Sequence, residues 1–111
     1  MNNKFNLEIK MKEFILDNDT IIINFPKREY ILKDKIETTS LEILELIFLA
    51  NNTNNNEYID IILSKISMLD FYLEKSYKRK YINKKVLERK VYELTLITKM
   101  IYGWKNYVRD R

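Results

Sequence analysis

The chain of 111 residues contains no cysteine and no histidine. Without cysteine there are no disulfides, no thiolate metal sites and no cysteine nucleophiles. Without either residue type, the usual zinc sites and the Ser-His and Cys-His catalytic pairs each lack a necessary member. We therefore expect a protein that is not an enzyme and that holds no metal or other cofactor. Catalysis by carboxylates, tyrosines or lysines is the alternative, although no spacing in the sequence points to it.

Glycine and proline, which most often interrupt regular structure, occur once each. Their scarcity favours a few long helices over many short strands. Turn signals occur in three places: at Phe25-Pro26, in the asparagine-rich stretch 51–56 and at residues 81–83. Three connectors imply four helices, which we expect over residues 5–24, 27–50, 55–78 and 83–109.

Long hydrophobic runs are also absent, and the longest covers only residues 46–50. A transmembrane helix needs about 20 consecutive apolar residues. The first residues, 1–4, have neither the apolar core nor the cleavage site of a signal peptide. We expect a cytoplasmic protein that does not enter a membrane.

Apolar residues recur at alternating steps of three and four in each predicted helix, which is the spacing of a single helix face. The predicted core positions are Leu7, Met11, Phe14, Asn18, Ile21 and Phe25; Leu32, Ile36, Thr39, Ile43 and Ile47; Ile59, Ile62, Ile66, Leu69 and Leu73; and Leu87, Val91, Leu94, Thr98 and Ile101. The β-branched run 20–23 leaves a short strand as an alternative at the end of the first helix. Long helices with short connectors lie antiparallel to their neighbours. The pattern thus predicts one all-α domain over residues 1–111, an antiparallel up-down-up-down four-helix bundle.

Charge is unevenly distributed along the chain. Residues 1–74 hold 8 basic and 13 acidic side chains, whereas residues 75–111 hold 12 basic and 3 acidic ones. Such asymmetry is typical of proteins that bind a polyanion, and nucleic acid is the commonest partner of this kind. The predicted nucleic-acid-binding residues are Lys75, Lys78, Arg79, Lys80, Lys84, Lys85, Arg89 and Lys90. Tyr77 and Tyr81 lie among them, and each could stack on an unpaired base or pack against the loop. For the basic cluster as a whole, the alternative is a solvated junction between two helices with no binding role.

The fourth helix carries apolar and aromatic residues outside its predicted core face. A helix in an isolated bundle needs one apolar face, so a second one indicates contact with another subunit. The predicted oligomer interface consists of Ile97, Met100, Gly103, Trp104 and Tyr107. The alternative is that Trp104 and Met100 complete the core of their own bundle.

Two segments resemble a family of small four-helix bundle proteins. Residues 25–32 read Phe-Pro-Lys-Arg-Glu-Tyr-Ile-Leu, and residues 94–105 read Leu94-x-x-Ile97-x-x-Met100-Ile101-x-Gly103-Trp104-Lys105. They are similar to the Phe-Pro-Arg entry into helix 2 and to the Gly-Trp ending of the accessory variability determinant (Avd) of diversity-generating retroelements. The family also includes proteins encoded in intervening sequences of bacterial ribosomal RNA. Residues 36–42 are acidic and polar where the family is arginine-rich, which moves the expected nucleic-acid contacts to residues 75–90.

The resemblance, which spans Phe25 to about Lys105, implies a homopentameric barrel of bundles that associates with a reverse transcriptase and binds its RNA or DNA. In that role the protein is a non-catalytic accessory for complementary-DNA synthesis in mutagenic retrohoming. The alternative is a structural homo-oligomer of the ribosomal intervening-sequence type, with no nucleic-acid role.

Overall fold

A computed structural model describes the backbone of residues 3–53 and 55–109, with side chains over 6–53 and 55–105. Its elements are α1 (Asn3–Ile22), the 3₁₀ turn η1 (Lys27–Glu29), α2 (Tyr30–Thr53), α3 (Glu57–Lys78) and α4 (Lys84–Arg109). The all-α prediction with four helices is confirmed. The alternative of a strand at residues 20–23 is wrong, because α1 continues to Ile22 and no strand occurs in the described chain.

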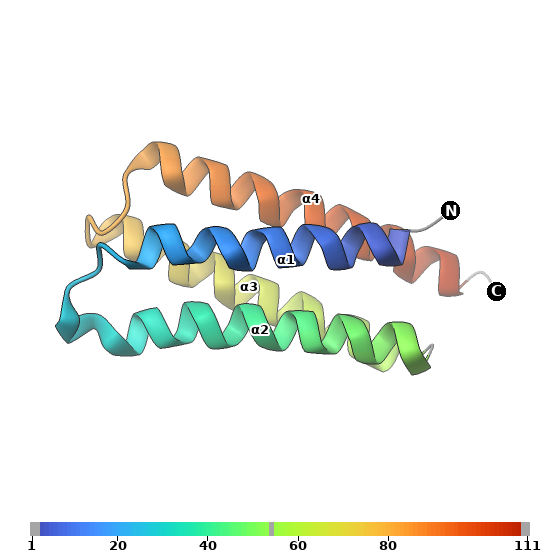
Figure 1. The fold of residues 1–111 in the computed structure, drawn as a ribbon. Coiled ribbons are helices and arrows are strands. Elements are labelled where there is room, and N and C mark those ends of the chain that lie inside the picture. Colours follow the sequence, from blue (N-terminus) through green and yellow to red (C-terminus); the bar gives the residue numbers. More distant parts are fainter. Residues whose placement is uncertain (1–2, 54, 110–111) are drawn as a thin grey trace.

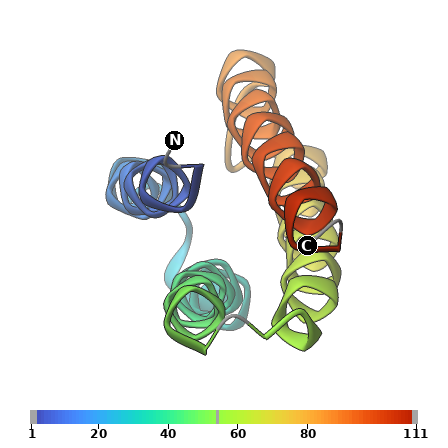
Figure 2. The same cartoon turned by 90° about the vertical axis from the view of Figure 1, so that its right-hand side faces the viewer.

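The four helices form a ring of antiparallel neighbours (Figures 1 and 2). α1 packs against α2 and α4, and α3 packs against the same two helices, whereas in the described residues the backbones of the diagonal pairs do not approach closely. The molecule measures 47 × 23 × 19 Å. The α1–α2 and α3–α4 connections lie at one end of this elongated bundle, and the start of α1 and the end of α4 lie at the other (Figure 1).

The α1–α2 connection makes α2 start later than the predicted residue 27. Pro26 is extended, with φ −60° and ψ 150°. The Glu29 N–H donates to the Pro26 carbonyl at 2.9 Å, which closes the tight turn η1 before α-helical bonding begins at Tyr30. Pro26 therefore lies outside α2 and starts the turn that leads into it.

The predicted core faces of the first three helices are confirmed, since every predicted position in them is buried. Asn18 is the polar member of the α1 face and is fully buried. Its amide donates to the Ser40 hydroxyl on α2 at 3.1 Å, and Ser40 donates in turn to the Ile36 carbonyl at 2.7 Å. These hydrogen bonds offset part of the cost of removing the amide and the hydroxyl from water, and the Asn18 Oδ1 is buried without a hydrogen-bond partner among the described residues.

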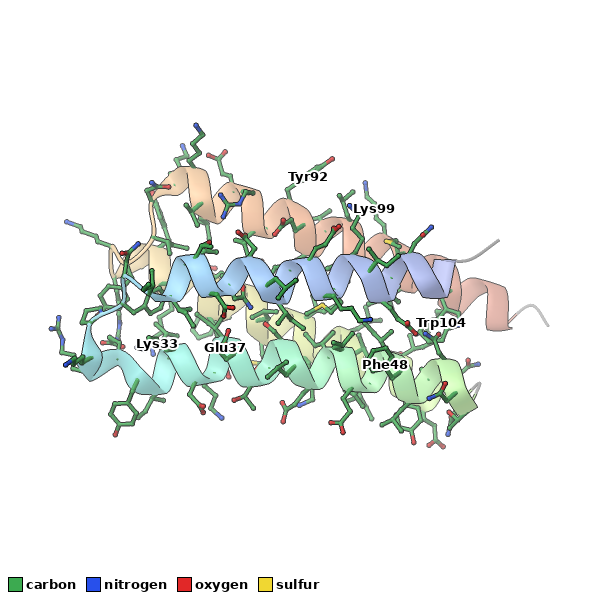
Figure 3. All side chains as sticks on the ribbon, viewed as in Figure 1. Lys33, Glu37, Phe48, Tyr92, Lys99 and Trp104 are labelled. Atoms are coloured by element: carbon green, nitrogen blue, oxygen red, sulfur yellow. The ribbon has the colours of Figure 1, made fainter. Side chains whose placement is uncertain are left out.

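The core face of α4 differs from the prediction. Its buried residues are Lys90, Leu94, Ile97, Ile101 and Trp104, whereas Val91 and Thr98 are only half-buried. Two predicted interface residues, Ile97 and Trp104, are 1% and 5% exposed and belong to the core of their own bundle. Figure 3 shows Trp104 among the helices.

The oligomer-interface prediction is therefore wrong for Ile97 and Trp104, which have almost no surface left for a partner. Of the other members of the set, Met100 is half-buried against the core and Gly103 is exposed. The Tyr107 side chain lies outside the described residues.

Candidate nucleic-acid interface

The basic cluster surrounds the connection between α3 and α4. α3 ends in a Schellman-type cap: the Lys80 N–H donates to the Tyr77 carbonyl and the Tyr81 N–H to the Ser76 carbonyl, both at 2.9 Å. This cap needs a left-handed residue after the helix, and Lys80 takes that conformation with φ 67°. The Lys80 backbone is therefore fixed even though its side chain is exposed.

Asn83 caps the start of α4. The Val86 N–H donates to its side-chain oxygen Oδ1 at 2.8 Å, and the Leu87 N–H donates to its carbonyl at 3.0 Å. The first turn contains no acidic residue, and Lys84 and Lys85 are exposed there. Cations at a helix N-terminus oppose the helix dipole, which costs about 0.3–1 kcal/mol each. These two lysines are therefore not explained by helix stability.

Contacts with the α1–α2 connection hold the cap in place. Arg79 donates to both carboxylate oxygens of Glu29, at 2.8 and 3.1 Å, and the rings of Phe25 and Tyr81 lie 5.2 Å apart. A hydrogen bond from the Tyr81 hydroxyl and the Arg79 guanidinium lower the pKa of Glu29, although partial burial opposes the shift. Arg79 is thus engaged by an ionised carboxylate.

Lys90 is not a surface residue, so its predicted role in nucleic-acid binding is wrong. Its side chain is 0% exposed, and its Nζ donates to the Phe14 carbonyl at 2.9 Å while lying 3.4 Å from the centre of the Phe14 ring. Asp17 and Glu93 each lie 3.3 Å from the ammonium. Burial lowers the pKa of Lys90, and these two carboxylates act in the opposite direction.

Arg89 also forms an ion pair within its own bundle, with Asp17 of α1, although its side chain is 49% exposed. Its guanidinium donates to the two oxygens of Asp17 at 3.0 and 3.2 Å. Burial by itself raises the pKa of Asp17, but the charges and hydrogen bonds of Lys90 and Arg89 outweigh it and lower that pKa. Arg89 and Lys90 together fasten α4 to α1.

The remaining members of the predicted set stay available. Lys78, Lys80, Lys84 and Lys85 are exposed and Lys75 is half-buried, and none of the five forms an ion pair with a described residue. Residues 75–85 contain six basic side chains and no acidic one.

The structure adds Lys27 and Arg28, which are exposed in η1 at the same end of the bundle. We call residues 27–28 and 75–85 the basic end. Sequence reasoning missed this addition, although the first and third connectors of any up-down-up-down bundle must meet at one end.

A shallow hollow opens on the basic end. It is lined by Tyr77, Lys78, Lys80, Tyr81, Ile82 and Asn83. The Tyr81 ring and the buried Ile82 are fixed by packing, whereas the Tyr77 side chain is 36% exposed. Sequence reasoning left Tyr77 and Tyr81 with the same two alternatives, base stacking or packing. The structure distinguishes them, because Tyr81 packs on Phe25 whereas Tyr77 is partly exposed.

Other kinds of site are not evident in the part of the chain that the structure describes. No group of three or more acidic side chains there is placed to hold a metal ion. None of the described helices is long and apolar enough to span a bilayer.

Comparison with known proteins identifies no family for the chain, because no protein-family model matches the sequence and no curated protein is significantly similar to it. Its function has to follow from its own residues.

Proposed function

We propose that the protein is a non-catalytic nucleic-acid-binding accessory protein and that its basic end contacts the phosphate backbone. The observation that supports the proposal is a group of four exposed lysines, Lys78, Lys80, Lys84 and Lys85, without carboxylate partners among the described residues. Their ammonium groups can replace the counterions condensed on a polyanion, and the release of those counterions drives binding.

The local balance of charge also supports this end as the contact surface. In the rest of the bundle some basic residues pair with acidic ones of another helix, as in Lys65–Glu42 at 3.2 Å and Lys105–Asp60 at 2.8 Å, and others, such as Lys33 and Lys99, form no ion pair with a described residue. The basic end differs because residues 75–85 hold six basic side chains and no acidic one, and among the described residues Arg79 alone of this group has a carboxylate partner. A cluster that served solubility alone would not need to be this free of acidic neighbours.

The protein partner in this proposal is the reverse transcriptase of a diversity-generating retroelement. The resemblance of residues 25–105 to the Avd family supports it, and the polymerase chemistry then belongs to the partner. The accessory would help to hold RNA or DNA during complementary-DNA synthesis in mutagenic retrohoming. Self-association and a cytoplasmic location are part of the same proposal.

Salt-dependent binding to labelled RNA and DNA tests the nucleic-acid part. We expect affinity to fall steeply with the logarithm of salt concentration, with a slope of about −0.7 to −0.9 for each phosphate contacted. The double variant Lys84→Glu, Lys85→Glu should bind more weakly and with a shallower slope. The double variant Lys10→Glu, Lys99→Glu has the same net charge but alters exposed lysines away from the basic end, and it should bind nearly as the parent does.

A flat salt response of the parent protein would refute nucleic-acid binding. It would leave the alternative, a structural homo-oligomer. Equal losses in the two double variants would refute the basic end as the contact surface, because only net charge would then matter.

A further inference from the structure

We infer that the basic end binds single-stranded nucleic acid, with an unpaired base stacked on the ring of Tyr77. This inference rests on the proposed function and narrows its ligand. It follows from the combination in the hollow of an exposed aromatic ring with Lys78 and Lys80. Phosphate-binding lysines beside a stacking ring are the usual components of single-strand recognition.

Tyr77 is the more exposed of the two tyrosines that line the hollow. The side chain of Tyr77 is 36% exposed, and its hydroxyl makes no hydrogen bond to a described residue. Tyr81, its neighbour in the hollow, packs on Phe25 and its hydroxyl interacts with Glu29. Tyr77 therefore offers the more accessible ring to a ligand in the hollow.

The hollow is held in one shape before any ligand arrives. The cap at Lys80, the side-chain cap of Asn83 and the bidentate Arg79–Glu29 pair fix the backbone on all sides of it. A preformed site avoids the entropy cost of ordering a loop on binding. The Asn83 Oδ1 accepts from Val86, which leaves its amide N–H₂ without an acceptor among the described residues and able to donate to a base carbonyl.

A duplex cannot stack a base on the Tyr77 ring. Its bases are stacked on one another and present only their edges in the grooves. An unpaired base can leave its neighbours, stack on a side chain and offer its pairing edge. The lysines alone would bind both forms, so the tyrosine ring is the feature that selects the single strand.

A pair of strands with equal charge tests the inference: an oligouridylate, and an abasic strand of the same length and the same number of phosphates. We expect the parent protein to bind the oligouridylate about tenfold more tightly than the abasic strand. Tyr77→Leu should bind both strands equally, at the level of the abasic one, with an unchanged salt slope. Tyr77→Phe keeps the ring and should retain the preference. Tyr92→Leu is the matched control, because Tyr92 is 63% exposed and projects from the outer face of α4 (Figure 3).

The outcomes separate this inference from the proposed function. If the parent binds both strands with equal affinity and a steep salt slope, nucleic-acid binding stands and base stacking is refuted. Tighter binding of a duplex than of the oligouridylate would also refute it, as would a preference that survives Tyr77→Leu. If neither strand binds, both the inference and the proposed function fail.

Discussion

Lys90 occupies an interior position on α4 although its side chain carries a charge. The position is tolerated because the ammonium has a carbonyl acceptor, two carboxylates and an aromatic face around it, all within 3.4 Å. The methylene chain supplies apolar contact at the same time. One residue thus acts both as a core side chain and as a polar link between α1 and α4.

We expect Lys90→Ala to lower the free energy of unfolding by about 3 kcal/mol, since it leaves a cavity and removes the main partner of two carboxylates. Lys90→Met fills the same space but still removes the partner of the two carboxylates, so it should cost less than Lys90→Ala, about 2 kcal/mol. Arg89→Ala is the control: it removes a cation from the same Asp17 at an exposed site, and about 0–1 kcal/mol is expected. Urea unfolding monitored by circular dichroism measures all three. A smaller loss for Lys90→Ala than for Arg89→Ala would contradict the interior role of Lys90.

The position of Lys90 was available in the sequence. Counting back from Trp104 by alternating steps of three and four passes through Ile101, Ile97 and Leu94 and arrives at Lys90. The predicted face instead followed the same spacing back from Ile101 through Thr98, Leu94 and Val91 to Leu87. That single choice placed Lys90 on the surface and Ile97 and Trp104 in an interface. Which acceptors surround a buried ammonium depends on α1, and periodicity within α4 does not contain that information.

At the scale of elements, the link between α3 and α4 combines a favourable cap with an unfavourable residue. Lysine at φ 67° brings its Cβ close to its own carbonyl, and glycine is preferred at this cap position for that reason. The charge of Lys80 has no partner in the described residues that would compensate. Its presence fits a role in binding better than a role in stability.

We expect Lys80→Gly to raise the free energy of unfolding by about 0.5–1 kcal/mol while weakening nucleic-acid binding by one phosphate contact. The matched control is Lys78→Gly, which removes the same charge from a helical residue of α3 and should lower stability by up to about 1 kcal/mol. The midpoint of urea unfolding and the salt slope of binding are the two measurements. A loss of stability in Lys80→Gly would show that its side chain stabilises the fold.

The elements themselves were largely predictable. The buried faces of α1, α2 and α3 follow the three-four spacing closely, and even the polar Asn18 was placed in the core by position alone. The bounds were less accurate: α2 begins at Tyr30 rather than residue 27 and extends to Thr53. Pairings such as Arg79–Glu29, 50 residues apart, depend on how two connectors meet in space, and local sequence carries no signal for them.

At the scale of the whole molecule, every helix exposes some large apolar side chains, and those of α2 accompany a hollow on the same helix. Tyr30, Ile31 and Leu41 are 65%, 61% and 52% exposed. A further shallow hollow on this helix is lined by Thr38, Leu41, Glu42, Leu44, Glu45 and Phe48. A helix that is apolar over much of its circumference is usually buried in a larger structure.

Charge favours a second copy of the chain as the partner of α2. Within α2, residues 30–35 carry two basic and one acidic side chain, whereas residues 36–50 carry three acidic and no basic ones. Two α2 helices that approach in antiparallel orientation would therefore place opposite charges together. A two-fold contact of this kind closes at two subunits, whereas the resemblance to the Avd family implies five.

We expect multi-angle light scattering to give a mass that is a multiple of the 13.6 kDa chain, and the multiple distinguishes two subunits from five. Leu41→Lys should return the mass to that of one chain, because it places a charge in the apolar contact. Ser64→Lys, at an exposed polar position on α3, should leave the assembly intact. A parent protein of single-chain mass, or an assembly that survives Leu41→Lys, would rule out self-association through α2.

The two ends of the elongated bundle differ in what they can be connected to. α1 starts and α4 finishes at the pole remote from the lysines of the α3–α4 link. A surface anchor, a reporter domain or an enzyme could therefore be fused before α1 or after α4. The fused part would lie far from the basic end and leave that end accessible. In such a fusion the bundle would act as a spacer that holds the basic end up to 47 Å from the attached body.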